Sequence, residues 1–77
     1  MTAASILIID DKKTELSVLS RILSTEGHIR LATSGEQGIE KAIRFQPDLV
    51  LLDIVMPELN GFDVLKKLKN NSITHKI

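Results

Sequence analysis

Cysteine, tryptophan and tyrosine are absent from this 77-residue chain, and only two of its residues are phenylalanine. Without cysteine the chain has no disulfide framework, zinc ribbon, iron–sulfur cluster or thiol nucleophile. With so few aromatic side chains, a surface on which nucleic-acid bases stack is not expected either. A small domain without such staples must fold around its own apolar core or against a partner.

Net charge is also lacking, because ten Lys and Arg residues balance ten Asp and Glu residues. The basic patch that direct nucleic-acid binding requires is therefore not expected. The longest apolar runs are the four-residue segments Ile6–Ile9 and Leu49–Leu52, which are far too short to cross a membrane. No basic segment followed by an apolar stretch begins the chain. We expect a soluble, cytoplasmic protein that binds neither nucleic acid nor a membrane.

The residues that are present predict one small folded domain. Hydrophobic residues make up 43% of the chain and charged residues 26%, which is typical of a globular protein and not of a disordered tail. A chain of about this length buries only roughly 60% of its unfolded surface, so the stability margin is narrow.

Apolar runs predict the strands of a parallel sheet. Ile6–Ile9 and Leu49–Leu52 are continuously apolar, which indicates strands buried on both faces. A shorter strand is predicted over 29–32, where apolar residues flank Arg30. The order βαβαβα with short connections favours right-handed crossovers, parallel strands and helices on both faces of the sheet.

Three amphipathic helices are predicted between and after these strands. The first is expected over 14–25, with Gly27 placed to end it. Ser34 and Gln37 match a capping box at the start of the second, and Asn60 is the expected N-cap of the third. The expected inward positions are Leu16, Leu19, Ile22 and Leu23, then Ile39, Ala42 and Ile43, then Val64, Leu65 and Leu68.

Acidic residues follow two of the predicted strands. Asp10 and Asp11 come after the first, and Asp53 comes after the third. Ligands of an open parallel sheet bind beyond the carboxyl ends of its strands, so these carboxylates are expected to converge. Because like charges repel, the cluster calls for a cation, and Mg²⁺ prefers oxygen ligands of this kind. A carboxylate can also act as a nucleophile and become an aspartyl phosphate.

Taken one at a time, these acids also have structural explanations. Asp11 could cap the following helix, since acids are common near helix N-termini. Asp53 could simply mark the end of a strand. Their shared position at one sheet edge favours a functional site.

The run from Asp53 to Gly61, at its distance from Asp10 and Asp11, resembles the receiver domain of two-component response regulators. The segment 32–38 and the pair Pro47-Asp48 are similar to that family too, so the resemblance covers essentially the whole chain. It implies an α/β, flavodoxin-like (CheY-like), doubly wound parallel sheet with strand order 2-1-3. Residues 1–77 would then be the N-terminal three βα units of a single receiver domain, without its C-terminal part.

The resemblance also implies roles for individual residues. Asp53 would be the phosphoacceptor, taking a phosphoryl group from a phosphohistidine on a sensor histidine kinase or phosphotransfer protein. Mg²⁺ would be held by Asp10, Asp11, Asp53 and the backbone carbonyl of Val55. The chain would be a signalling module and not itself an enzyme, and the nature of any output domain stays open.

The chain departs from the family pattern in two ways. The Ser or Thr that ends the fourth strand of a receiver and the Lys that ends the fifth have no counterpart in residues 1–77, and Lys76 stands too early to replace the latter. Lys12 and Lys13 follow the acid pair, where many relatives carry another acid. We expect these lysines to be solvated at the helix start; the alternative is that Lys12 lowers the affinity for metal.

Two other functions stay open at this point. A truncated, non-phosphorylatable fragment could act only by assembly, and the unpaired edge of Leu49–Leu52 predicts a two-fold dimer through the third strand. The other is an aspartyl-phosphate phosphatase. Val55 stands where such enzymes usually carry a second Asp, which argues against this second alternative.

Overall fold

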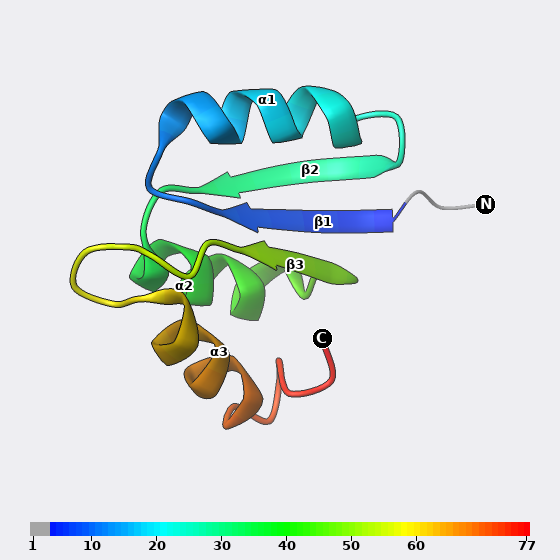
Figure 1. Cartoon of the computed structure of the whole chain (residues 1–77). Helices are drawn as coiled ribbons and strands as arrows, with labels where there is room; N and C mark the ends of the chain where they lie inside the picture. Colours follow the sequence, from blue (N-terminus) through cyan, green and yellow to red (C-terminus); the bar gives the residue numbers. More distant parts are fainter. Residues whose placement is uncertain (1–3) are drawn as a thin grey trace.

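Strands and helices alternate along the chain in the computed structural model, which describes residues 4–77 (Figure 1). The strands are β1 (Ala4–Ile9), β2 (Gly27–Ala32) and β3 (Leu49–Leu52). The helices are α1 (Lys13–Leu23), α2 (Gly35–Phe45) and α3 (Gly61–Lys69). All pairings are parallel and the order is β2-β1-β3, with Ile6 opposite both Ile29 and Leu49. The predicted α/β fold with strand order 2-1-3 is confirmed.

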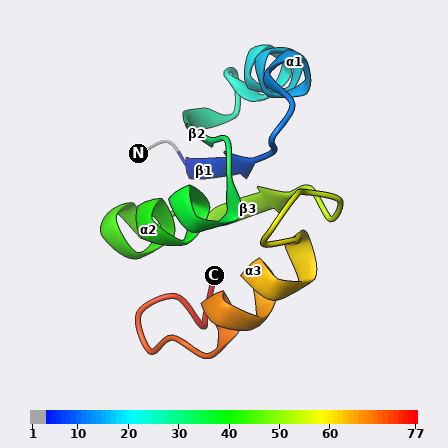
Figure 2. The same cartoon turned by 90° about the vertical axis from the view of Figure 1, so that its left-hand side faces the viewer.

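The central strand β1 supplies the core on both faces of the sheet. Residues 6–9 are each at most 4% exposed. Because successive side chains of a strand point to opposite faces, Ile6 and Ile8 pack with Leu16 of α1, whereas Leu7 and Ile9 pack with residues of α2 and α3. Figure 2 shows α1 on the opposite side of the sheet from α2 and α3. The prediction of burial on both faces is confirmed for β1. It is wrong for β3, where Leu49 is 47% exposed and the other three residues are only half-buried, because β3 lies at the edge of the described sheet.

Two positions that were expected to point inward are exposed instead. Ile22 of α1 is 63% exposed and Leu65 of α3 is 45% exposed. Each lies on the apolar side of its helix, but the side chains of residues 4–77 that pack there are too few to bury it. Hydrophobic spacing identified the apolar face of each helix correctly, and only part of each face is covered.

Gly27 begins β2 and does not end α1, which was a wrong expectation. The helix ends at Leu23, and a turn follows in which the Glu26 N–H donates to the Leu23 carbonyl at 2.9 Å. A Cβ at Gly27 would overlap the carbonyl oxygen of Ala4 on the neighbouring strand. Glycine is therefore required here by the close approach of β1.

Side-chain caps at two helix starts agree with the sequence. The Ser34 hydroxyl accepts from the Gln37 N–H at 3.2 Å, and the Gln37 amide oxygen accepts from the Thr33 N–H at 3.0 Å. The reciprocal bond of the capping box thus goes to the residue before Ser34. Asn60 caps α3 by accepting from the Asp63 N–H at 3.0 Å. None of the helices within residues 4–77 combines the length and the apolar character needed to cross a bilayer.

The left-handed backbone at the end of α2 leads to a stability prediction. Gln46 has φ 46° while its N–H donates to the Ala42 carbonyl, a position that usually favours glycine. We expect Gln46→Gly to raise the free energy of unfolding by about 0.5–1 kcal/mol, because it relieves backbone strain. Gln46→Val should lower it, since a β-branched residue tolerates positive φ poorly. Urea unfolding of the two variants tests this, and equal midpoints would contradict it.

Candidate functional site

The backbone of the sheet fixes the positions of the acids at its carboxyl edge. The Asp10 N–H donates to the Ala32 carbonyl at 3.0 Å, and the Asp53 N–H donates to the Ile9 carbonyl at 2.9 Å. The backbone of each acid therefore adds one more hydrogen bond between its own strand and the neighbouring strand, just beyond the end of its own strand. The strand arrows all end on this side of the molecule, where the loop after β3 also lies (Figure 1).

Lys12 joins the acids of both strands. Its ammonium lies 2.9 Å from Asp53 Oδ2, 3.3 Å from Asp11 Oδ1 and 3.8 Å from Asp10 Oδ1. The expectation that Lys12 is merely solvated at the helix start was therefore wrong. The reason is that Asp53, though 41 residues away in the chain, comes within hydrogen-bond distance of this side chain.

Both oxygens of Asp53 are hydrogen-bonded. Oδ2 accepts from the Lys12 ammonium, and Oδ1 accepts from the Val55 N–H at 3.2 Å. The hydrogen bond from Lys12 lowers the pKa of the Asp53 carboxyl, against the opposing effect of burial. The same contacts with Asp53 and Asp11 raise the pKa of the Lys12 ammonium. Asp53 is therefore a carboxylate, and Lys12 a cation, at neutral pH.

Asp10 is the buried acid of the site, with 4% of the residue exposed. Its Oδ1 accepts from the Lys12 N–H at 2.9 Å, which holds the turn between β1 and α1. Asp11 is half-buried and accepts from the Lys12 ammonium, not from a backbone N–H of α1. The side chain of Asp11 therefore does not cap α1, which was the structural explanation considered for this acid.

Glu15, which no motif in the sequence singled out, adds another carboxylate. Oxygens of Asp10, Glu15 and Asp53 all lie within 4.8 Å of one another. Hydrogen bonding with Asp10, followed by burial, raises the pKa of the Glu15 carboxyl. Its position in the first turn of α1, five residues after Asp10, was the available signal, although an acid there also has a common structural explanation.

This donor set fits Mg²⁺. Oxygens that share one Mg²⁺ at about 2.1 Å lie roughly 3–4 Å apart, so the observed spacing needs only small side-chain rotations. Asp10, Glu15 and Asp53 can supply such oxygens. Asp11 lies outside this group of three but touches the same lysine. For Val55, the described contact is its N–H on Asp53, and the metal-binding role of its carbonyl stays a prediction.

Gly61 lets the loop after β3 pack against the site. Its N–H donates to the Ile54 carbonyl at 2.9 Å. A Cβ at Gly61 would overlap the Asp53 carbonyl oxygen and lie 2.6 Å from Ile54 Cα. Glycine is required at this first position of α3 because a side chain there would collide with the backbone of Asp53 and Ile54.

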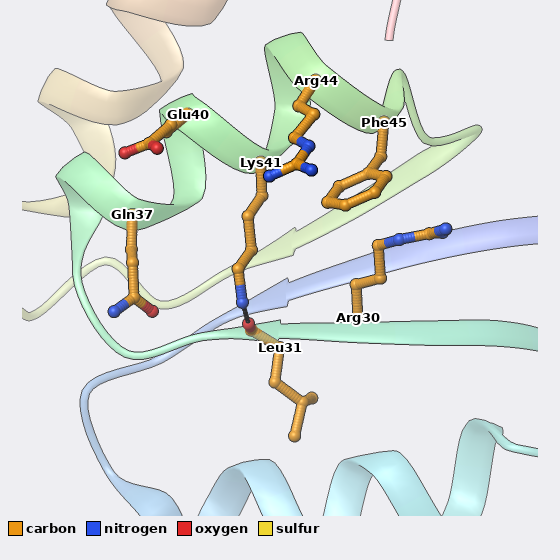
Figure 3. Close-up of a pocket in the computed structure, with 7 residues that line it drawn as sticks. All are labelled: Arg30, Leu31, Gln37, Glu40, Lys41, Arg44 and Phe45. Atoms are coloured by element: carbon orange, nitrogen blue, oxygen red, sulfur yellow. Dashed lines mark hydrogen bonds between the residues drawn. The ribbon is translucent and has the colours of Figure 1, made fainter.

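Apart from the acidic cluster, the structure has a cavity of about 320 Å³ that is lined by residues of α2 and β2 (Figure 3). Its cationic groups already have partners within the chain. The Lys41 ammonium donates to the Leu31 carbonyl, and the guanidinium groups of Arg30 and Arg44 lie 4.1 and 5.3 Å from the centre of the Phe45 ring. This cavity shares no residue with the acidic cluster. Because its cations are already paired, the candidate functional site is the carboxyl edge of the sheet.

Comparisons with known sequences agree on one family. A model described as the response regulator receiver domain matches residues 6–77. Protein PilH of Pseudomonas aeruginosa is 43% identical over 75 residues, which cover 96% of this chain and 62% of that protein. A probable cyclic di-GMP phosphodiesterase of Vibrio cholerae is 38% identical over 77 residues, which cover 100% of this chain and 18% of that protein. The chain thus spans less than two thirds of the length of these relatives.

Solved structures give the same answer. The N-terminal domain of a response regulator receiver protein from Methanoculleus marisnigri superposes with a TM-score of 0.93 at 33% identity, covering 96% of this chain and 61% of that one. The response regulator domain of CheB from Thermotoga maritima gives 0.83 at 32% identity, covering 94% and 56%. With its parallel order β2-β1-β3 and its acids at the carboxyl edge, the chain belongs to the family of response regulator receiver domains.

Proposed function

We propose that this chain is a phosphoacceptor module of a two-component phosphorelay and that Asp53 carries the phosphoryl group. The observation that carries the proposal is the position of the Asp53 carboxylate. It lies at the carboxyl edge of the sheet with Asp10 and Glu15, and its side chain is 19% exposed. It is ionised, so it has a free lone pair for attack, and it is accessible to a donor protein.

In this reaction an Asp53 carboxylate oxygen attacks the phosphorus of a phosphohistidine on a sensor kinase or phosphotransfer protein. A P–O bond forms, the P–N bond to the imidazole breaks, and the imidazole takes a proton from solvent. Mg²⁺, when bound, neutralises charge on the phosphoryl oxygens during the transfer. Asp10 and Asp11 would hold that ion with Asp53 and the Val55 carbonyl, and Glu15 adds a further carboxylate.

The contacts around Asp53 also favour attack through one oxygen. Oδ1 accepts from the backbone N–H of Val55, whereas Oδ2 accepts only from the Lys12 ammonium among the described contacts. Fixing one oxygen orients the other toward solvent and the acidic cluster. We therefore assign Oδ2 as the nucleophilic atom.

Incubation with acetyl phosphate, a small phosphoryl donor, tests this function. We expect one hydroxylamine-labile phosphoryl group per chain, formed faster when Mg²⁺ is added. Hydroxylamine cleaves acyl phosphates and leaves phosphoserine and phosphothreonine intact. A hydroxylamine-stable product, or no product with any donor, would contradict the proposal.

We further propose the setting of this module. Residues 1–77 correspond to the N-terminal three βα units of a single receiver domain, working in the cytoplasm with a sensor histidine kinase or a phosphotransfer protein. Signalling by phosphoryl transfer, and not turnover of a substrate, is the proposed activity. An attached output domain would decide the response, as the probable phosphodiesterase among the relatives illustrates for another protein.

The free edge of β3 predicts association of the 77-residue chain. Among the described strands, β3 pairs only with β1, and its outer side borders an apolar groove of about 400 Å³. Leu49 and Phe62 there are 47% and 64% exposed. We expect two copies to meet through β3 in a two-fold dimer, because an open apolar edge is a template for pairing. Sedimentation at micromolar concentration tests this, and a stable, folded monomer would contradict it.

A further inference from the structure

The Lys12 ammonium occupies the space between the acids of the site. It lies within 4 Å of carboxylate oxygens from three residues, Asp10, Asp11 and Asp53. It is the only cationic side chain with an ion pair to these acids among residues 4–77. The Lys12 ammonium therefore neutralises part of the negative charge of these acids.

A divalent ion bound to Asp53 would have to share this space. An ion bound to either oxygen of the Asp53 carboxylate at about 2.1 Å would lie within a few ångströms of the present position of the Lys12 ammonium, which is 2.9 Å from Oδ2 of that carboxylate. A double and a single positive charge at such a distance repel each other appreciably, even with water between them. The ammonium and the ion thus compete for the same carboxylates.

The position of Lys12 allows its side chain to move away from the acids. Its side chain is 49% exposed, and its backbone lies in the extended region just before α1. A flexible four-carbon stem lets the ammonium move into solvent without disturbing the helix. With Glu15 beside Asp10 and Asp53, the acids of the site outnumber the one ammonium, so the site still attracts a cation.

We propose that Lys12 is a tethered counter-cation that competes with Mg²⁺ for Asp53 and Asp11, so that metal binds only when the lysine swings out. This inference rests on the proposed function of the site and names a residue that tunes it. Lys12 sets how much Mg²⁺ the site needs, and it shields Asp53 Oδ2 while metal is absent.

Metal titration of four proteins tests the proposal without measuring phosphorylation. The wild type, Lys12→Met, Lys12→Arg and Lys13→Met are titrated with MgCl₂ at constant ionic strength, and the amide resonances of residues 10, 11 and 53 are followed. We expect Lys12→Met to bind Mg²⁺ about tenfold more tightly, since one competing charge is gone. Lys12→Arg keeps the charge, and Lys13→Met removes the neighbouring one, so both should stay within about twofold of wild type.

The outcomes separate this inference from the function on which it rests. Equal Mg²⁺ affinity in wild type and Lys12→Met would overturn the role of Lys12 and leave the metal site intact. Equal tightening in Lys12→Met and Lys13→Met would also overturn it, because the effect would be one of general charge. Absence of Mg²⁺ binding in all four proteins would overturn both this inference and the metal part of the proposed function. Phosphorylation of the wild type by acetyl phosphate tests the acceptor role separately.

Discussion

Asp53→Asn is expected to reduce phosphorylation by acetyl phosphate to the level of a reaction without protein. An amide has no anionic oxygen that can attack phosphorus, so the acceptor is lost while the shape of the side chain is kept. Hydrogen bonding is largely retained, since the amide oxygen can still accept from the Val55 N–H. Incorporation of the phosphoryl group is measured by intact mass with and without hydroxylamine.

Asp48→Asn is the matched control for this experiment. Asp48 is exposed, lies just before β3, and accepts from the Ser5 N–H at 2.7 Å through a contact that an amide oxygen can reproduce. We expect this variant to be phosphorylated like the wild type. Unchanged phosphorylation of Asp53→Asn, or an equal loss of phosphorylation in both variants, would contradict the role of Asp53 as the acceptor.

Gly61→Ala is expected to lower the free energy of unfolding by about 1–3 kcal/mol and to disturb the site at the same time. The added methyl group would overlap the Asp53 carbonyl and crowd Ile54 Cα, and both are backbone atoms that cannot rotate away. The loop must therefore move, and Asp53 moves with it. Urea unfolding gives the stability change, and the amide resonance of residue 53 reports the displacement.

Lys66→Ala is the control on the same helix. Lys66 is exposed on α3, and Ala is a good helix former, so the expected change is within about 0.5 kcal/mol. A Gly61→Ala variant as stable as this control, with an unmoved resonance at residue 53, would show that the loop does not press on the backbone of Asp53.

The convergence of Asp10 and Asp53 could be predicted from the sequence, because it follows from topology alone. Two apolar runs end on acids, and parallel strands bring such ends to one edge of the sheet. This convergence depends on the backbone, which the pattern of strands and helices largely determines.

Glu15 could not be found in this way, and an effect of Lys12 on the metal site was only the less favoured of two interpretations, because both roles depend on where side chains reach. A lysine and a glutamate at the start of a helix are ordinary surface residues in most sequences. Only the placement of Asp53 beside them brings both into the site. Ile22 and Leu65 illustrate the same limit, since hydrophobic spacing shows which face of a helix is apolar but not what covers it.

Chemical trapping of the phosphorylated residue tests the central claim most directly. Borohydride reduces an acyl phosphate on aspartate to homoserine, so the acceptor is converted into a residue that tandem mass spectrometry can locate. After treatment with acetyl phosphate and Mg²⁺, we predict homoserine at position 53 and unmodified aspartate at positions 10 and 11. Homoserine at position 10 or 11, or a phosphoryl group that resists borohydride and remains on another residue, would contradict the account.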